Sequence, residues 1–292
     1  MTHRDIAAVG ADGIGSSLET VHTLKPVVDD RSFDAGRYWE DMHRSNAGFA
    51  AVGFGVLGTQ FNSWMYRVRR RVLRRAVRRA AIQVRGASVL DVGTGTGFYV
   101  REWKRLGAAD ITGIDVSAAA VSRLRREIPE ARFLEADVAD PVPETLAGPF
   151  DLVSAFDVLF HIVDDTRFGW AIENLGRLTR PGGHLVLSEN FLRGSTLRHH
   201  HQVSRTREEI DRALTTAGFE TVLRLPMFVL LNSPVDSESR PLRLFWRGLA
   251  GVSRRSHRLG GLLAASLYVP ELALTAVVRE GPSTELHVCR RL

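Results

Sequence analysis

The stretch from Val89 to Phe98, which reads Val-Leu-Asp-Val-Gly-Thr-Gly-Thr-Gly-Phe, constrains the fold of this chain more than any other. Val89, Leu90 and Val92 indicate a short buried strand, and three glycines at alternate positions follow it. Glycine lets the backbone turn sharply and approach a ligand closely, because it has no Cβ atom. A helical pattern begins after the glycines, and the first N–H groups of a helix point toward whatever lies in the turn. The stretch therefore predicts a strand–turn–helix cradle for a nucleotide.

The region around this turn alternates short apolar strands with amphipathic helices. We expect strands over residues 87–93, 110–116, 132–138, 150–157, 184–190 and 219–225. Helices are expected over 96–106, 118–128, 164–179 and from 206 to 218. Ser117 is a good N-cap, and Thr206 with Glu209 forms a capping box. This alternation predicts a mainly parallel sheet with helices on both faces, which binds ligands at the carboxyl ends of its strands.

Acidic residues follow the glycine turn at the ends of the next two expected strands. Asp115 comes about 20 residues after the turn, where a carboxylate can accept hydrogen bonds from both ribose hydroxyls. Asp137 ends the following strand, and Phe133 and Val138 can line an apolar slot beside it. The glycines are spaced two apart rather than as G-x-G-x-x-G, so a dehydrogenase is the least favoured interpretation.

Taken in order, these motifs over residues 85–225 resemble the class I S-adenosylmethionine (SAM) dependent methyltransferases, of a bacterial small-molecule type. The strand ending in Phe156 and Asp157 and the turn Arg180-Pro-Gly-Gly are similar to later motifs of that family. The resemblance implies SAM as cofactor and a doubly wound, seven-stranded, mainly parallel sheet with an antiparallel last strand beside the fifth. The resemblance implies that Asp137 accepts a hydrogen bond from the adenine amino group. The cofactor-binding residues expected on the sheet are Asp91, Gly93, Thr94, Gly95, Gly97, Asp115, Val116, Asp137, Val138 and Phe156.

The chain is long enough for one large α/β domain with additions. We expect an N-terminal arm and helical cap over 1–80, in which 1–32 form a loose arm, and a SAM-binding core over 81–225. The proline-rich segment 226–284 is expected to form a helical lid over the acceptor. Residues 285–292 are expected to form the last strand. The apolar run 261–278 is interrupted by Pro270 and Glu271, so we expect no transmembrane segment.

Methyl transfer needs alignment of the reactants and exclusion of water, and a hydroxyl or ammonium acceptor must also lose a proton. His161, His201 and Glu189 are the candidates for this proton transfer, because they follow the fourth and fifth expected strands. A mainly aromatic group is expected to fold over the cofactor and acceptor, since a cationic sulfonium is attracted to aromatic faces. Its members are Tyr38, Trp39, Asn62, Trp64 and Tyr66. No set of residues has convincing metal-ligand spacing.

The net charge is +6, and nearly all of the positively charged residues are arginines. A helix over residues 67–79 is rich in arginine, which leaves a nucleic-acid methyltransferase as an alternative. A non-catalytic SAM-binding or membrane-surface protein that associates through 226–284 is a second alternative. We favour a small-molecule acceptor methylated on O or N, less so on C, and expect no nucleic-acid partner. The single cysteine, Cys289, and the absence of a signal-like run near Met1 predict a cytoplasmic protein, and a homodimer stays open.

Overall fold

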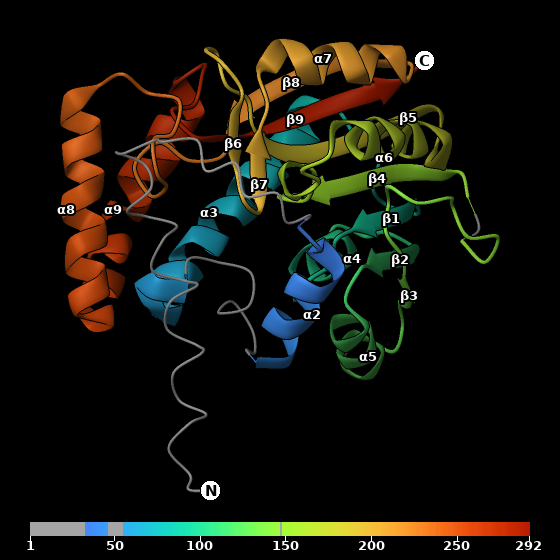
Figure 1. Cartoon of the computed structure of the whole chain (residues 1–292), viewed down its shortest axis with the longest axis horizontal. Coiled ribbons are helices and arrows are strands. Elements are labelled where there is room, and N and C mark those ends of the chain that lie inside the picture. The colour runs from blue at the N-terminus through green and yellow to red at the C-terminus, as the bar shows by residue number, and fades with distance from the viewer. Residues whose placement is uncertain (1–32, 46–54, 147) are drawn as a thin grey trace, which may run out of the picture. The chain divides into compact units, whose positions relative to one another are not determined.

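The structure is a computed structural model that describes residues 33–45, 55–146 and 148–292 (Figure 1). The arm predicted over 1–32 lies outside the described residues. A seven-stranded sheet has the order β3-β2-β1-β4-β5-β9-β8, and β9 runs antiparallel to both of its neighbours. The strands are β1 (Ser88–Val92), β2 (Asp110–Asp115), β3 (Arg132–Glu135), β4 (Phe150–Phe156), β5 (Thr179–Asn190), β8 (Phe219–Pro226) and β9 (Thr284–Arg291). The predicted fold class is confirmed.

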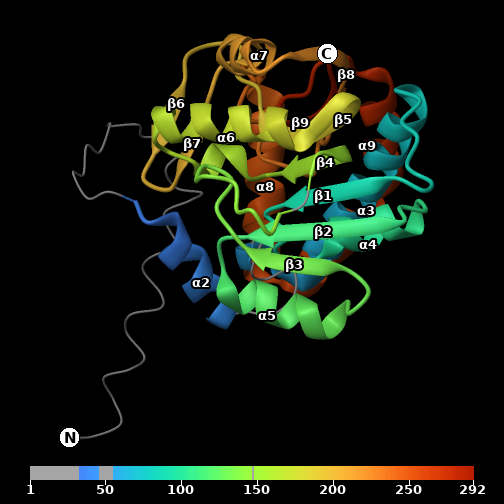
Figure 2. The same ribbon diagram turned by 90° about the vertical axis from the view of Figure 1, so that its right-hand side faces the viewer.

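Helices cover both faces of the sheet, and each face has its own apolar core. One face packs against α3 (Gly58–Arg79), α4 (Phe98–Arg105) and α5 (Ala118–Glu127). The other face packs against α6 (Asp165–Leu178) and α7 (Arg207–Thr216). Both faces of the parallel strands are buried, which explains their near-continuous apolar sequences. Figure 2 shows β3, β2, β1 and β4 in succession, with α5 below β3.

The predicted helix starts at Ser117 and Thr206 match the structure, whereas the helix predicted from residue 96 begins at Phe98. The Ser117 hydroxyl accepts a hydrogen bond from the Ala120 N–H, and Thr206 and Glu209 form the reciprocal capping box. The third strand ends at Glu135 rather than at 138, because Asp137 folds back and accepts a hydrogen bond from the Ala139 N–H. The fifth strand begins at Thr179, five residues earlier than predicted.

A short hairpin, β6 (Leu197–His199) and β7 (Gln202–Ser204), was not predicted from the sequence. It lies between β5 and α7 and places the three consecutive histidines at and beside its turn. A 3₁₀ turn, η3 (Leu159–His161), follows β4. The hairpin and this turn are adjacent, so two segments distant in sequence meet above the sheet edge.

The segment predicted as a lid forms α8 (Arg240–Arg255) and α9 (His257–Val277). Both helices stand beside α3 in Figure 1, and α9 packs along it. The α3–α9 contact includes the Trp64 and Tyr268 rings, 5.2 Å apart, and hydrogen bonds from Arg75 to the Leu272 carbonyl and the Thr275 hydroxyl. A role for these helices as an acceptor lid stays a prediction.

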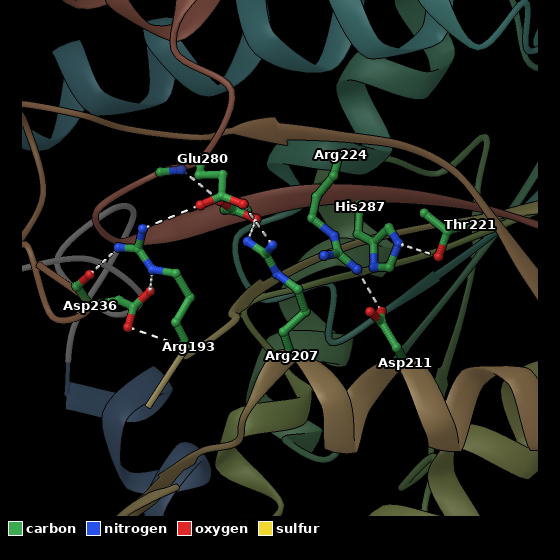
Figure 3. Close-up of polar contacts among 10 residues, drawn as sticks. Arg193, Arg207, Asp211, Thr221, Arg224, Asp236, Glu280 and His287 are labelled. Atoms are coloured by element: carbon green, nitrogen blue, oxygen red, sulfur yellow. Dashed lines mark hydrogen bonds and ion pairs between the residues drawn. The ribbon is translucent and has the colours of Figure 1, made fainter. Parts of the chain in front are cut away.

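Ion pairs connect the residues around β8 and β9 with α7 and with the loop after β5 (Figure 3). The pairs are Arg193–Asp236, Arg193–Glu280, Arg207–Glu280, Arg207–Glu285 and Arg224–Asp211. His287 on β9 is fully buried between them, and its Nε2 lies 2.9 Å from the Thr221 hydroxyl. Burial, together with the charges of Arg224 and Arg207, lowers the pKa of His287 to about 3.

Candidate active site

The glycine turn between β1 and α4 has a backbone conformation that favours glycine. Gly93, Gly95 and Gly97 have φ angles of 66°, 48° and 73°, in the left-handed region. A Cβ atom on Gly93 would lie 2.4 Å from Cγ2 of Val158, and one on Gly97 would lie 2.6 Å from a Leu124 methyl carbon. The side-chain oxygen of Thr94 is buried within the turn and has no hydrogen-bond partner among the described residues. Close packing therefore requires glycine at Gly93 and Gly97, and the Thr94 hydroxyl remains available to a ligand.

Asp115 at the end of β2 ties this turn to the start of α5. One carboxylate oxygen accepts the Gly95 N–H at 2.8 Å, and the other accepts the Ser117 N–H at 2.9 Å. Burial raises the pKa of Asp115 despite these hydrogen bonds. Each oxygen keeps capacity for a second hydrogen bond, so the carboxylate can still accept from a ribose hydroxyl.

Asp91 at the end of β1 lies beneath the turn. Its carboxylate accepts a hydrogen bond from the Ser154 hydroxyl at 2.6 Å, and that hydroxyl accepts one from the Trp103 indole at 2.9 Å. Burial raises the pKa of Asp91 to about 7. The side chain is therefore oriented by its neighbours and buried close to the predicted cofactor site.

The predicted adenine end of the site lies after β3. The Asp137 carboxylate pairs with Arg167 at 3.0 Å, and the Val138 carbonyl accepts a hydrogen bond from the Asn174 amide at 2.9 Å. Val138 is buried in the core on the α6 face, and Val116 is half-buried just after β2. Both α6 contacts hold this loop in one conformation at the carboxyl edge of the sheet.

Helix α2 (Ala35–Ser45) is held against the same edge, beside α5 (Figure 2). Its Glu40 carboxylate accepts hydrogen bonds from the Ser117 hydroxyl at 2.7 Å and from the Ala119 N–H at 3.0 Å. These two bonds lower the pKa of Glu40. His43, one turn further along α2, is buried near Asp115.

Two of the predicted catalytic histidines meet under the other end of α2. The Trp39 ring lies 4.8 Å from the His161 ring, and the Tyr38 ring stacks on His201 at 5.7 Å. The Nδ1 atom of His161 lies 2.9 Å from the backbone carbonyl oxygen of His201. Burial lowers the pKa of His161 to about 4 and that of His201 as well. We call Tyr38, Trp39, His161 and His201 the histidine–aromatic cluster.

Glu189, the third predicted catalytic residue, is buried below this cluster. Its carboxylate accepts the Phe160 N–H at 3.1 Å and also interacts with the Leu159 N–H. Burial raises the pKa of Glu189 well above its ordinary value. The hydrogen bonds fix the η3 turn that carries His161, so Glu189 positions the histidine through the backbone.

Trp64 and Phe156 point away from the histidine–aromatic cluster. Trp64 packs on Tyr268 and under the Arg67 guanidinium, whereas Tyr66, two residues later on α3, packs 4.7 Å from Phe98. Residues two apart on a helix face different sides, which explains why Tyr66 rather than Trp64 approaches the glycine turn. The Phe156 ring is buried, stacked 3.6 Å from Tyr99.

An ion pair between a buried arginine and a partly exposed aspartate at the end of β4 was not predicted. Arg69 of α3 lies 2.6 Å from the Asp157 carboxylate and donates a hydrogen bond to the Tyr99 hydroxyl. Asp157 has a φ of 58° and also accepts a hydrogen bond from Ser188. Burial alone lowers the pKa of Arg69, but the Asp157 charge outweighs it, so the net shift is upward. Arg69 is four residues after Met65 and occupies the apolar stripe of α3, a signal that sequence reasoning could have used.

The described residues hold no group of three or more histidine, cysteine or acidic side chains arranged to bind a metal ion.

Comparisons with known proteins point to one family. Residues 89–183 match the family model described as a methyltransferase domain. A ubiquinone biosynthesis O-methyltransferase of Xanthomonas oryzae pv. oryzae is 36% identical over 113 residues, which cover 37% of this chain and 45% of that protein. Nodulation protein S of Rhizobium tropici is 31% identical over 100 residues, which cover 34% and 42%. The chain thus matches less than half the length of these curated relatives.

Among solved structures, the fold is similar to N-methyltransferase NodS from Bradyrhizobium japonicum WM9 in complex with S-adenosyl-l-homocysteine (SAH). The TM-score is 0.50 at 15% identity, over 87% of this chain and 98% of NodS. At this identity the likeness concerns the fold alone. The family match covers the glycine turn together with Asp115, Asp137 and Asp157, so the segment that carries the candidate site is similar in sequence to a methyltransferase domain.

Proposed function

We propose that this protein transfers a methyl group from SAM to an oxygen or nitrogen atom of a small molecule. The observation that carries the proposal is the placement of His161 at the same sheet edge as the glycine turn, because β4 is the neighbour of β1. SAM supplies a methyl group on a cationic sulfur with a good, neutral leaving group. The protein therefore has to align the reactants and exclude water.

The residues present fit this cofactor. The glycine turn and the unpaired Thr94 hydroxyl would receive its amino-acid portion, and Asp115 would accept from the ribose hydroxyls. Asp137 and Val138 would receive the adenine. Helix α2, fastened through Glu40, would exclude water from above.

His161 is the group best placed to take the proton of the acceptor. A carbonyl oxygen only accepts hydrogen bonds, so the contact with the His201 carbonyl requires a proton on Nδ1 and leaves the lone pair on Nε2. With its pKa near 4, the ring is neutral at physiological pH. A weak base suffices here, since the proton of the attacking atom becomes strongly acidic as the new bond to carbon forms. His201 would act as a positioning residue.

The arginines of α3 support a small-molecule acceptor over a nucleic acid. Arg69 pairs with Asp157, and Arg70 and Arg74 pair with Glu102 of α4. Arg75 is bound to α9. These four guanidinium groups are therefore occupied within the molecule, which leaves fewer of them for phosphate contacts.

Calorimetric titration of the whole chain with SAM, SAH and NAD⁺ tests the cofactor. We expect micromolar binding of SAM and SAH and none of NAD⁺, and binding of NAD⁺ alone would refute the proposal. A gel shift with RNA and DNA at physiological salt tests the acceptor class. A specific complex with either polymer would favour the nucleic-acid alternative.

A further inference from the structure

The outer face of α9 is apolar along its whole length. Leu259, Leu262, Val269 and Val277 are 52%, 67%, 71% and 74% exposed, and Leu263 is exposed beside them. The inner face packs inside the protein through small or buried residues. These inner residues are Gly260, Gly261, Ala264, Glu271 and Thr275.

Helix α8 extends this apolar surface. Leu244, Phe245 and Val252 are exposed, whereas Trp246 and Leu249 on its other side are buried. Among the described residues, eight of the eleven exposed large apolar side chains belong to α8 and α9. Single exposed apolar residues are ordinary, but their concentration on two helices that pack together indicates an interaction surface. We call the exposed residues of α8 and α9 the apolar face.

The exposed charged residues that belong to α8 and α9 are arginines. Helix α8 carries exposed Arg247, Arg254 and Arg255, and Arg258 follows in the first turn of α9. Within residues 240–278 the one acidic residue is Glu271, which is fully buried. Its carboxylate accepts hydrogen bonds from the Val229 and Leu230 N–H groups at 2.8 and 2.7 Å. The exposed residues of α8 and α9 therefore combine aliphatic groups with guanidinium groups, and the nearest exposed carboxylates in the sequence, Glu238 and Glu280, lie outside the two helices.

We propose that α8 and α9 dock onto the surface of an anionic phospholipid bilayer. Helices with an apolar face and arginines at its margins lie in the interface plane, with the aliphatic groups at the boundary of headgroups and acyl chains. The arginines reach the lipid phosphates, because long basic side chains extend toward water while their stems stay in apolar surroundings. The charge complementarity of the face selects an anionic surface.

The contacts of α9 favour this orientation over a membrane-spanning one. By length and composition α9 could cross a bilayer. Its inner face, however, is bound to α3 through Arg75, and it holds the buried Glu271 carboxylate that caps backbone N–H groups. Insertion across a bilayer would break these contacts. Pairing with a second copy is also disfavoured, since a twofold contact through this face would bring arginine-rich margins together.

Co-sedimentation of the whole chain with vesicles tests the proposal. We expect binding to vesicles of phosphatidylcholine mixed with phosphatidylglycerol, and at least about tenfold weaker binding to phosphatidylcholine alone or at high salt. The double variant Leu262→Gln/Val269→Gln should lose about tenfold in affinity for the mixed vesicles. Trp170→Gln, at a 50% exposed position on α6, is the matched control and should bind like the unmodified chain.

SAM affinity measured on each variant separates loss of docking from loss of folding. Equal vesicle binding by the double variant and the unmodified chain would overturn the proposal. So would an unmodified chain that is a dimer without vesicle binding and becomes a monomer in the double variant. Resistance of the bound protein to an alkaline carbonate wash would overturn the surface orientation.

Discussion

The Nδ1 atom of His161 lies 2.9 Å from the backbone carbonyl oxygen of His201, which joins the turn after β4 to the hairpin between β5 and α7. This hydrogen bond sets the tautomer of His161 through a backbone group, so no side-chain partner is needed for it. The His201 ring is then free to stack on Tyr38. The two histidines would therefore have different roles, one at the reacting atom and one in positioning.

Replacement of His161 tests the first role. We expect His161→Gln to lower kcat by about a hundredfold or more, with SAM affinity unchanged, because proton removal by a side chain typically contributes this factor. His200→Gln is the control, since His200 is exposed in the same hairpin. Steady-state kinetics and calorimetry on the same preparations measure both effects, and an unchanged kcat for His161→Gln would remove it as the base.

Asp115→Asn tests the ribose acid. An amide oxygen replaces only one of the two carboxylate oxygens, so either the Gly95 or the Ser117 N–H loses its acceptor. We expect SAM affinity to fall by at least about tenfold, which corresponds to a loss of 1.4 kcal/mol. Asp110→Asn at the exposed start of the same strand should leave SAM affinity unchanged. Normal SAM binding by Asp115→Asn would contradict the assignment.

The Arg69–Asp157 pair predicts a stability effect. Asp157→Asn leaves a buried guanidinium without its counter-charge, and we expect the free energy of unfolding to fall by about 3–5 kcal/mol. Asparagine tolerates the left-handed backbone at this position, so the change isolates the charge. The double variant Arg69→Met/Asp157→Asn should recover much of the loss. Urea denaturation of the unmodified chain, the two single variants Asp157→Asn and Arg69→Met, and the double variant gives the coupling energy. Additive losses of stability would argue against the pair.

His287 predicts a loss of stability in acid. The unfolded chain takes up a proton on this residue near pH 6.5, whereas the folded protein does so only near pH 3. The neutral histidine therefore contributes stability above pH 6.5 that is lost as the pH falls below it, by about 1.4 kcal/mol per pH unit. Between pH 6.5 and 5, the free energy of unfolding of His287→Gln should fall by about 2 kcal/mol less than that of the unmodified chain. Parallel slopes of unfolding free energy against pH would show that His287 does not titrate on unfolding.

The sheet, its helices and their caps could be predicted from local patterns, because strand length, glycine turns and N-cap residues act over a few residues. Ser117 and Thr206 illustrate this, since each hydroxyl caps the helix that directly follows it. The antiparallel last strand came from the family resemblance and is confirmed by its pairing with β5.

Other features depend on partners distant in sequence. The direction of Trp64 is set by α9, about 200 residues later, and the burial of Arg69 is set by Asp157 at the end of β4. The hairpin at 197–204 is too short and polar to have a periodic signature. A pattern confined to one helix cannot reveal which of its sides meets another helix.

Glu40 holds α2 at the sheet edge through the Ser117 hydroxyl and the Ala119 N–H, at the start of α5. Neither of these groups is assigned a contact with the cofactor. Helix α2 would then have to move both for SAM to enter and for SAH to leave. Movement of α2, rather than the transfer step, would then limit the rate of turnover once the acceptor is saturating.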